Sequence, residues 1–144
     1  MNSDLRKAID MLQDGHYTCV LCKNDIIYTS TERGVKPLLE WMDRGIVLKD
    51  FSAADKVVGK AAAFLYVLFG VEEVYASVMS ERAIETLKAN GIRVNYKTSV
   101  SNIKNRTGKG FCPMEEAVRN ISVPSEALET VRKTLKELNK LHTI

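Results

Sequence analysis

The chain has 144 residues, of which 45% are hydrophobic and 27% are charged, and it contains only 3 prolines and 8 glycines. This size and composition predict one globular domain and exclude disordered, collagen-like and disulfide-rich proteins. The net charge of +3 is too small to indicate specific nucleic-acid binding, although a local basic cluster can still bind an anion.

The N-terminal half predicts two helices on either side of a β-hairpin. Residues 5–12 carry hydrophobic side chains at helical spacing. Residues 17–23 and 26–30 predict two strands joined by a tight turn. Residues 38–42 then predict a short helix, with a proline in its first turn.

The longest predicted helix covers residues 51–70 and ends at Gly70. Ser52 and Asp55 have the spacing of a capping box, in which each side chain binds a free backbone amide at the start of a helix. The second half of this segment is apolar on all sides. We therefore expect it to be a buried central helix against which a sheet packs.

The C-terminal half predicts a parallel strand pair and two further helices. Residues 72–78, 80–91 and 92–97 follow as strand, helix and strand, which predicts a right-handed βαβ unit. After an irregular basic segment, one helix is expected to begin at Pro113 and an amphipathic helix to follow Pro124.

Localisation is predicted from the cysteines and from the absence of targeting signals. The cysteines Cys19, Cys22 and Cys112 are too few for a disulfide framework, and the N-terminal residues carry no apolar signal-peptide core. The most apolar stretch, residues 61–71, is shorter than the roughly 18 residues that a membrane span needs. We therefore expect a cytoplasmic protein with no membrane partner.

Three segments carry a resemblance to a known family. YTSTERGVKPLLEW, FSAADKVVGKAAAFLY and NRTGKGFCPMEEAV, taken in this order, resemble a family of prokaryotic proteins of unknown function that is placed in the cytidine-deaminase-like superfamily. The resemblance implies a three-layer α/β/α fold, with a cytidine-deaminase-like mixed sheet flanked by helices in a single domain over residues 1–144. It implies no particular activity.

The resemblance to zinc deaminases does not extend to their metal ligands. Those enzymes carry His or Cys, any residue and Glu at the start of the central helix, and Pro-Cys-x-x-Cys at the next helix. Here these positions fall on residues 53–55 and 78–82, which offer no zinc ligand set. Cys19 and Cys22 would point to opposite faces of a strand. We expect no metal, no cofactor and no zinc-dependent deamination.

A first candidate ligand site follows from the predicted central helix. Asp55, Lys56, Gly59 and Lys60 would form one polar stripe near its start, and this stripe is suited to line a pocket for an anion. The alternatives are a capping role for Asp55 and a solvated helix face for the lysines. Arg33 is added as an edge of the same pocket because it lies in a segment that carries the family resemblance.

A second candidate ligand site is the basic segment before Pro113. Gly108 and Gly110 allow close approach to backbone amides, while Arg106 and Lys109 supply positive charge near a helix start. A flexible surface loop is the alternative. We expect this segment and the lysine stripe to lie on the same side of the domain, with no place for Lys104 in the pocket.

Cys112 is a candidate nucleophile because it precedes Pro113 at a predicted helix start, where the helix dipole favours a thiolate. Asp55, Glu115 or Glu116 would then carry the proton. The alternative is a thiol buried among apolar side chains and therefore inert.

These features favour binding of a small anionic or nucleotide-like ligand. The rival functions are a cysteine-dependent enzyme and a homodimeric interaction module.

Overall fold

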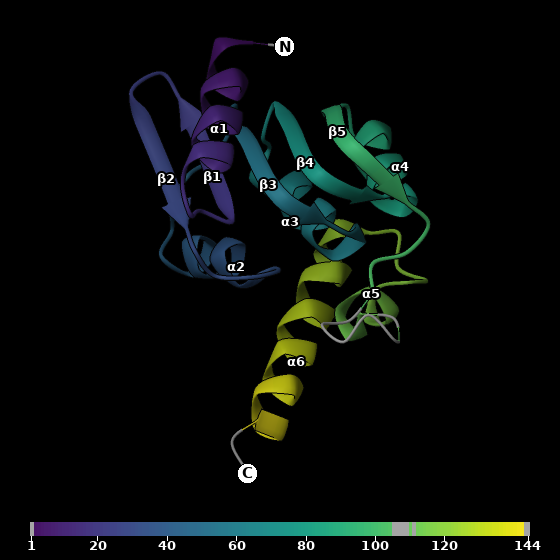
Figure 1. The fold of residues 1–144 in the computed structure, drawn as a ribbon. Helices are drawn as coiled ribbons and strands as arrows, with labels where there is room; N and C mark the ends of the chain where they lie inside the picture. Colours follow the sequence, from purple (N-terminus) through teal and green to yellow (C-terminus); the bar gives the residue numbers. More distant parts are fainter. Residues whose placement is uncertain (1, 105–109, 111, 143–144) are drawn as a thin grey trace.

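The computed structural model of the chain describes residues 2–104, 110 and 112–142. Its centre is a five-stranded sheet with the strand order β2-β1-β3-β4-β5 (Figure 1). The strands β1 and β2 form an antiparallel hairpin, β1 is antiparallel to β3, and β3, β4 and β5 are parallel. The strand bounds are β1 (Cys19–Lys23), β2 (Ile26–Ser30), β3 (Ser52–Val58), β4 (Glu73–Ser80) and β5 (Arg93–Val100).

Helices cover both faces of this mixed sheet, as the fold prediction requires. In Figure 1, α1 crosses one face in front of β1 and β3, while α3 lies behind the sheet. Contacts link α3 to α2, α4, α5 and α6, which places these helices together on the second face. The helix bounds are α1 (Ser3–Asp14), α2 (Lys36–Asp43), α3 (Lys60–Phe69), α4 (Glu81–Ala89), α5 (Pro113–Ala117) and α6 (Pro124–His142).

Strand β1 divides its side chains between two hydrophobic cores. Cys19 and Leu21 belong to the large core, which also contains the buried residues of α3. Val20 and Cys22 belong to the smaller core under α1. The two thiols of the C-x-x-C motif therefore face opposite sides of the sheet, as strand geometry predicts.

The prediction of a helix from residue 51 is wrong for its first half. Residues 52–58 form β3, and the helix begins only at Lys60, after Gly59 as N-cap. Ala53 and Ala54 have high helix propensity, yet both are fully buried on a central strand. Burial of one on each face of the sheet overrides that propensity. Ser52 and Asp55 are consequently not a capping box, and no helix face joins Lys56 to Lys60.

The remaining predicted elements are confirmed with small shifts in their bounds. Strands β4 and β5 are parallel and α4 connects them, with the Ser80 hydroxyl accepting a hydrogen bond from the Ala83 N–H at 3.1 Å. Strand β5 extends to Val100, beyond the predicted end. Helix α5 begins at Pro113 with Cys112 as N-cap.

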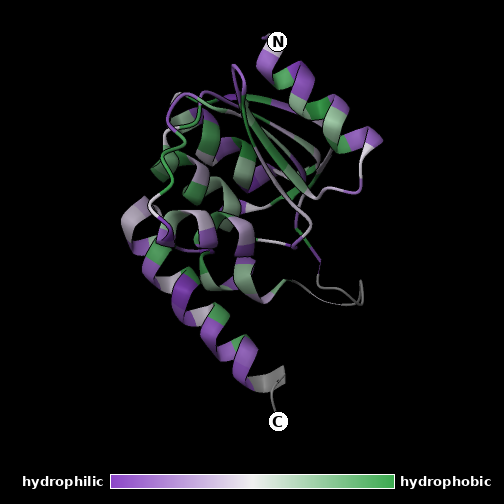
Figure 2. Cartoon of the chain, turned by 90° about the vertical axis from the view of Figure 1, so that its left-hand side faces the viewer, coloured by the Kyte–Doolittle hydropathy of each residue, from purple (hydrophilic) through white to green (hydrophobic). Residues whose placement is uncertain are grey.

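The C-terminal helix α6 begins in the core and ends beyond the sheet. Ala127 and Val131 near its start are fully buried. Figure 2 shows the rest of α6 extending away from the sheet, with hydrophilic residues along most of its length. Leu135 and Leu138 are partly buried against the large core. Within the described part of the chain, none of the helices combines the length and hydropathy that crossing a bilayer requires.

Candidate functional site

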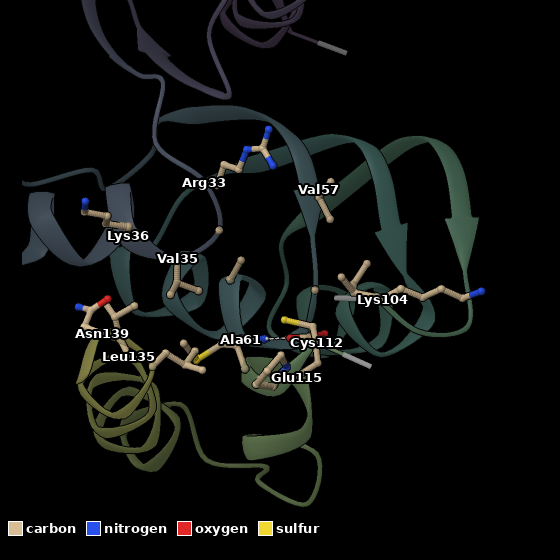
Figure 3. Close-up of a pocket in the computed structure, with 17 residues that line it drawn as sticks. Arg33, Val35, Lys36, Val57, Ala61, Lys104, Cys112, Glu115, Leu135 and Asn139 are labelled. Atoms are coloured by element: carbon tan, nitrogen blue, oxygen red, sulfur yellow. Dashed lines mark hydrogen bonds between the residues drawn. The ribbon is translucent and has the colours of Figure 1, made fainter. Parts of the chain in front are cut away.

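A cavity of about 490 Å³ opens at the carboxyl end of β3, and we call it the β3 pocket. Its walls come from the segment before α2, the start of α3, helix α5 and the far half of α6 (Figure 3). Ligand sites in open α/β sheets lie outside the carboxyl ends of the strands, which is where this cavity is found. Most of its wall is apolar, formed by Val57, Ala61, Ile103, Met114, Leu135 and Leu138.

Three cationic side chains stand at the edge of the β3 pocket. Arg33 precedes α2, Lys36 is the first residue of α2, and Lys104 follows β5. Figure 3 shows the three side chains reaching outward around the apolar wall. Lys36 lies 3.4 Å from Glu32, but both side chains are half exposed, so this ion pair is weak. Arg33 and Lys104 form no ion pair with the residues that the structure describes.

Glu115 joins α5 to the first turn of α3. Its Oε1 accepts a hydrogen bond from the Lys60 N–H at 2.6 Å, and its Oε2 accepts one from the Ala61 N–H at 2.9 Å. These amides belong to the first turn of α3, whose N–H groups have no partner within the helix. A carboxylate is favourable there because the N-terminal end of a helix carries partial positive charge. Glu115 therefore fixes one wall of the pocket.

Gly59 leaves the space that the Glu115 carboxylate needs to reach the first turn of α3. A Cβ atom at residue 59 would lie only 2.2 Å from Oε1 and 2.7 Å from Oε2 of Glu115. The backbone φ angle of Gly59 is −100°, which any residue adopts, so the requirement is for space alone. The predicted polar stripe included Gly59, and the structure assigns it this packing role.

Cys112 lies in the β3 pocket next to α5. The residue is partly exposed, and its backbone N–H donates to the Ile103 carbonyl at 3.0 Å. Within the described part of the chain, its Sγ makes no hydrogen bond to a side chain that could act as a base. The carboxylate of Glu115, one of its predicted proton carriers, is engaged by the two α3 amides.

Asp55 lies outside this pocket, in a buried polar cluster between the sheet and α3. Asp55 is 7% exposed, and its Oδ2 accepts a hydrogen bond from the Tyr66 hydroxyl at 2.7 Å. The same hydroxyl lies 3.4 Å from Cys19 Sγ, and Cys19 is the register partner of Asp55 on β1. Burial raises the pKa of Asp55 to about 7, although hydrogen bonds from Tyr66 and from backbone amides oppose the shift.

Burial also raises the pKa values of the two partners of Asp55. The pKa of the Cys19 thiol is raised by desolvation first and by the Asp55 charge second. The same two causes, in the same order, raise the pKa of Tyr66 well above its ordinary value. Cys19 and Tyr66 are therefore protonated at neutral pH, and the cluster offers no ready nucleophile.

The predicted lysine stripe is divided between two places. Lys56 is exposed on β3, and neither it nor Lys60 lines the β3 pocket. The Lys60 ammonium donates to the Arg119 carbonyl at 2.9 Å and lies 5.5 Å from the centre of the Phe64 ring. Lys104, which was predicted to have no place in the pocket, lines it instead, because the parallel strands β3, β4 and β5 all end at the same edge of the sheet.

The basic segment before Pro113 is only partly described. Arg106, Gly108 and Lys109, three of its predicted ligand-binding residues, lie outside the described residues. Gly110 is half-buried and does not line the β3 pocket. The predicted anion-binding role of this segment therefore stays a prediction.

Metal ligands do not gather in the described residues. No group of three or more His, Cys, Asp or Glu side chains there is arranged to hold a metal ion. Since α3 begins at Lys60, the residues at the start of the central helix are Gly59, Lys60 and Ala61 rather than the predicted 53–55. None of these three is a type of residue that binds zinc.

These features define an α/β protein with a mixed five-stranded sheet and a mainly apolar pocket at the carboxyl edge of its parallel strands. The chain belongs to the TM1506 family, a domain of unknown function (DUF1893), whose model matches residues 7–135. The predicted membership of a family of unknown function is thus confirmed. A search of curated proteins finds no match to this chain.

Two solved structures from Thermotoga maritima resemble the chain. The DUF1893 family protein TM1506 shares 25% identity and a TM-score of 0.83, over 95% of this chain and 92% of that one. A diaminohydroxyphosphoribosylaminopyrimidine deaminase/5-amino-6-(5-phosphoribosylamino)uracil reductase shares 12% identity and a TM-score of 0.42, over 81% of this chain and 40% of that one. The α/β fold with helices on both faces is therefore confirmed, whereas the closer likeness to cytidine deaminases stays a prediction.

Proposed function

We propose that the β3 pocket binds a small anionic, nucleotide-like molecule. The observation that carries this proposal is the combination of an apolar cavity with three cations at its edge, namely Arg33, Lys36 and Lys104. Apolar walls suit a flat ring, and a cationic edge suits a phosphoryl or carboxylate group attached to it.

The size of the pocket supports a ligand of this kind. Small-molecule sites occupy roughly 300–1,000 Å³ and are mainly apolar with a few polar groups that orient the ligand. The β3 pocket, at about 490 Å³, lies within this range. A ring that covers the exposed side chain of Val57 would remove water from it, which favours binding by about 25 cal/mol per Å² of apolar surface buried.

The charge around the pocket supports an anion rather than a neutral or cationic ligand. Among the described lining residues, Glu115 is the carboxylate, and both of its oxygens accept hydrogen bonds from α3 amides. Its charge is therefore directed at the helix terminus and does not neutralise the cations. The Arg33 guanidinium offers paired donors for a phosphoryl or carboxylate group.

The proposed role is binding, with no reaction assigned. A cysteine-dependent reaction at Cys112 would require a base within hydrogen-bond reach of its thiol. The described contacts of Cys112 include no such base, and Asp55 is buried against Tyr66 instead. No specific observation therefore favours the enzyme over the binding protein.

Thermal unfolding with matched ligands tests the proposal. The probes are the four ribonucleoside 5′-monophosphates, each compared with its own nucleoside at the same concentration and ionic strength. Because a ligand that binds only the folded state raises its stability, at least one nucleotide is expected to raise Tm more than its nucleoside does. Failure of all four nucleotides to raise Tm at millimolar concentration would contradict a nucleotide-like ligand.

A further inference from the structure

A second hollow lies on the helical side of the protein and shares no lining residue with the β3 pocket. This groove of about 600 Å³ runs between α3, α4 and the connection from α5 to α6, and we call it the α3/α4 groove. Its cationic residues come one from each of these segments: Lys60, Arg82 and Arg119. Among the described residues that line it, Glu85 is the carboxylate, so positive charge is in excess.

The three cations are poorly neutralised by the protein itself. Arg82 forms no ion pair with any residue that the structure describes. Arg119 lies 3.8 Å from Glu116, but both side chains are about half exposed, so this contact contributes little. A guanidinium group without a carboxylate partner retains its full set of donors for a ligand.

Contacts on two sides hold the Lys60 ammonium in place. It donates to the Arg119 carbonyl at 2.9 Å, and it lies 5.5 Å from the centre of the buried Phe64 ring. An ammonium group has three N–H donors, and the Arg119 carbonyl engages one of them. Because the side chain is already ordered, an anion in the groove would cost little of its conformational entropy.

Lys60 and Arg82 are close enough for their charges to interact. Burial lowers the pKa of Lys60, and the Arg82 guanidinium lowers it further, while Glu115 and Glu85 act in the opposite direction. Two cations that repel each other at the edge of one groove are stabilised by an anion between them.

We propose that the α3/α4 groove is a second anion site, distinct from the β3 pocket, that binds the phosphoryl group of a small molecule. Arg82 would provide paired donors to two phosphoryl oxygens, and the Lys60 ammonium would neutralise charge from the opposite wall. Asn120 and Ser122 line the same groove and add polar side chains at its margin. This site does not depend on the ligand proposed for the β3 pocket.

A titration with inorganic phosphate tests the second site, using the full chain at constant ionic strength and backbone amide NMR signals as the readout. We expect saturable shifts at the Thr86, Asn90 and Asn120 amides, which line the groove. Arg82→Gln should raise the phosphate Kd about fivefold or more because it removes the paired donors. Lys88→Gln is the matched control: it removes one positive charge from the same helix at an exposed residue outside the groove, and it should change Kd less than twofold.

Glu85→Gln is expected to strengthen phosphate binding, and a damaged fold could not produce such a gain in affinity. It removes the carboxylate of the groove lining and should therefore lower the phosphate Kd. Arg33→Gln should leave the Kd at the groove unchanged, which separates this site from the β3 pocket. The proposal is overturned if the amide shifts do not saturate, if Arg82→Gln and Lys88→Gln weaken binding equally, or if Glu85→Gln fails to tighten it.

Discussion

The Glu115 carboxylate occupies the space that a side chain at Gly59 would fill. A Cβ atom at residue 59 would lie 2.2 Å from Oε1, so the two residues are matched across the junction of α3 and α5. Because of this match, the Glu115 carboxylate caps α3, although Glu115 lies 55 residues after Lys60 in the chain. It also places α5, and with it Cys112, at the edge of the β3 pocket.

Because Glu115 caps α3 and Glu116 does not, substitution of Glu115 should lower the free energy of unfolding more than substitution of Glu116. Glu115→Gln should lower the free energy of unfolding by about 1–2 kcal/mol, because the amide side chain has one acceptor oxygen and no charge for the α3 terminus. Glu116→Gln is the control, since Glu116 is about half exposed and pairs only weakly with Arg119. Urea denaturation measures both variants, and equal losses of stability would contradict the capping role.

Gly59→Ala tests the same contact from the other side. The added methyl group would displace the Glu115 carboxylate and remove its hydrogen bonds to the Lys60 and Ala61 amides. We expect a loss of about 2 kcal/mol in the free energy of unfolding, as for the loss of charge-assisted hydrogen bonds. Combining Gly59→Ala with Glu115→Gln should cost less than the sum of the two single changes, since both remove one interaction. Strict additivity would show that the two residues act independently.

The buried Asp55 predicts a pH-dependent stability. Its pKa is about 7 in the folded protein, against an ordinary value of 3.8, because burial disfavours the charged carboxylate. At pH values between 3.8 and about 7, Asp55 is therefore more often protonated in the folded state than in the unfolded state. The stability from this group is therefore complete below about pH 4 and is lost as the pH rises to about 7, with a slope of up to ~1.4 kcal/mol per pH unit.

Asp55→Asn removes this titration and isolates its effect. The free energy of unfolding of the variant, relative to that of the wild type, should rise steadily between pH 4.5 and 7. Denaturant unfolding at several pH values measures this difference. A difference that stays constant across this range would show that Asp55 titrates with the same pKa in both states.

The three cysteines should differ in their reactivity toward a thiol reagent. Cys112 is partly exposed in the β3 pocket, whereas Cys19 and Cys22 are 2% and 0% exposed. Burial also raises the pKa of both strand cysteines, which lowers their thiolate fraction. Limiting alkylation of the native protein with iodoacetamide, followed by peptide mass spectrometry, should label Cys112 first. Equal labelling of all three cysteines would contradict the described burial.

The sequence predicts those elements whose signals are local. The two strands of the hairpin, each element of the βαβ unit and the start of α5 at Pro113 follow from residue patterns within single short segments. The helix is predicted to begin too early because Ser52 and Asp55 have the spacing of a capping box, whereas the burial of Ala53 and Ala54 on opposite faces of the sheet selects a strand there.

The candidate site was harder to predict because its contacts are distant in the sequence. Cys112 and Arg33 were predicted and do line the β3 pocket, but Lys104 was missed. The hydrogen bond from Tyr66 to Asp55 joins α3 to β3. No local sequence pattern indicates this hydrogen bond when both residues are assigned to one helix. Lys60 is predicted to share a helix face with Lys56, whereas its actual position in the α3/α4 groove depends on α4 and Arg119.

The nucleotide Kd of the wild type and of two matched arginine variants tests whether the ligand lies in the β3 pocket. Calorimetric titration uses the nucleoside 5′-monophosphate that raises Tm most. Arg33→Gln removes a cation at the edge of the β3 pocket, and Arg44→Gln removes one at the other end of α2, away from the pocket. We expect Arg33→Gln to raise Kd about fivefold or more and Arg44→Gln to change it less than twofold. Equal Kd values for the two variants would contradict a nucleotide site in the β3 pocket.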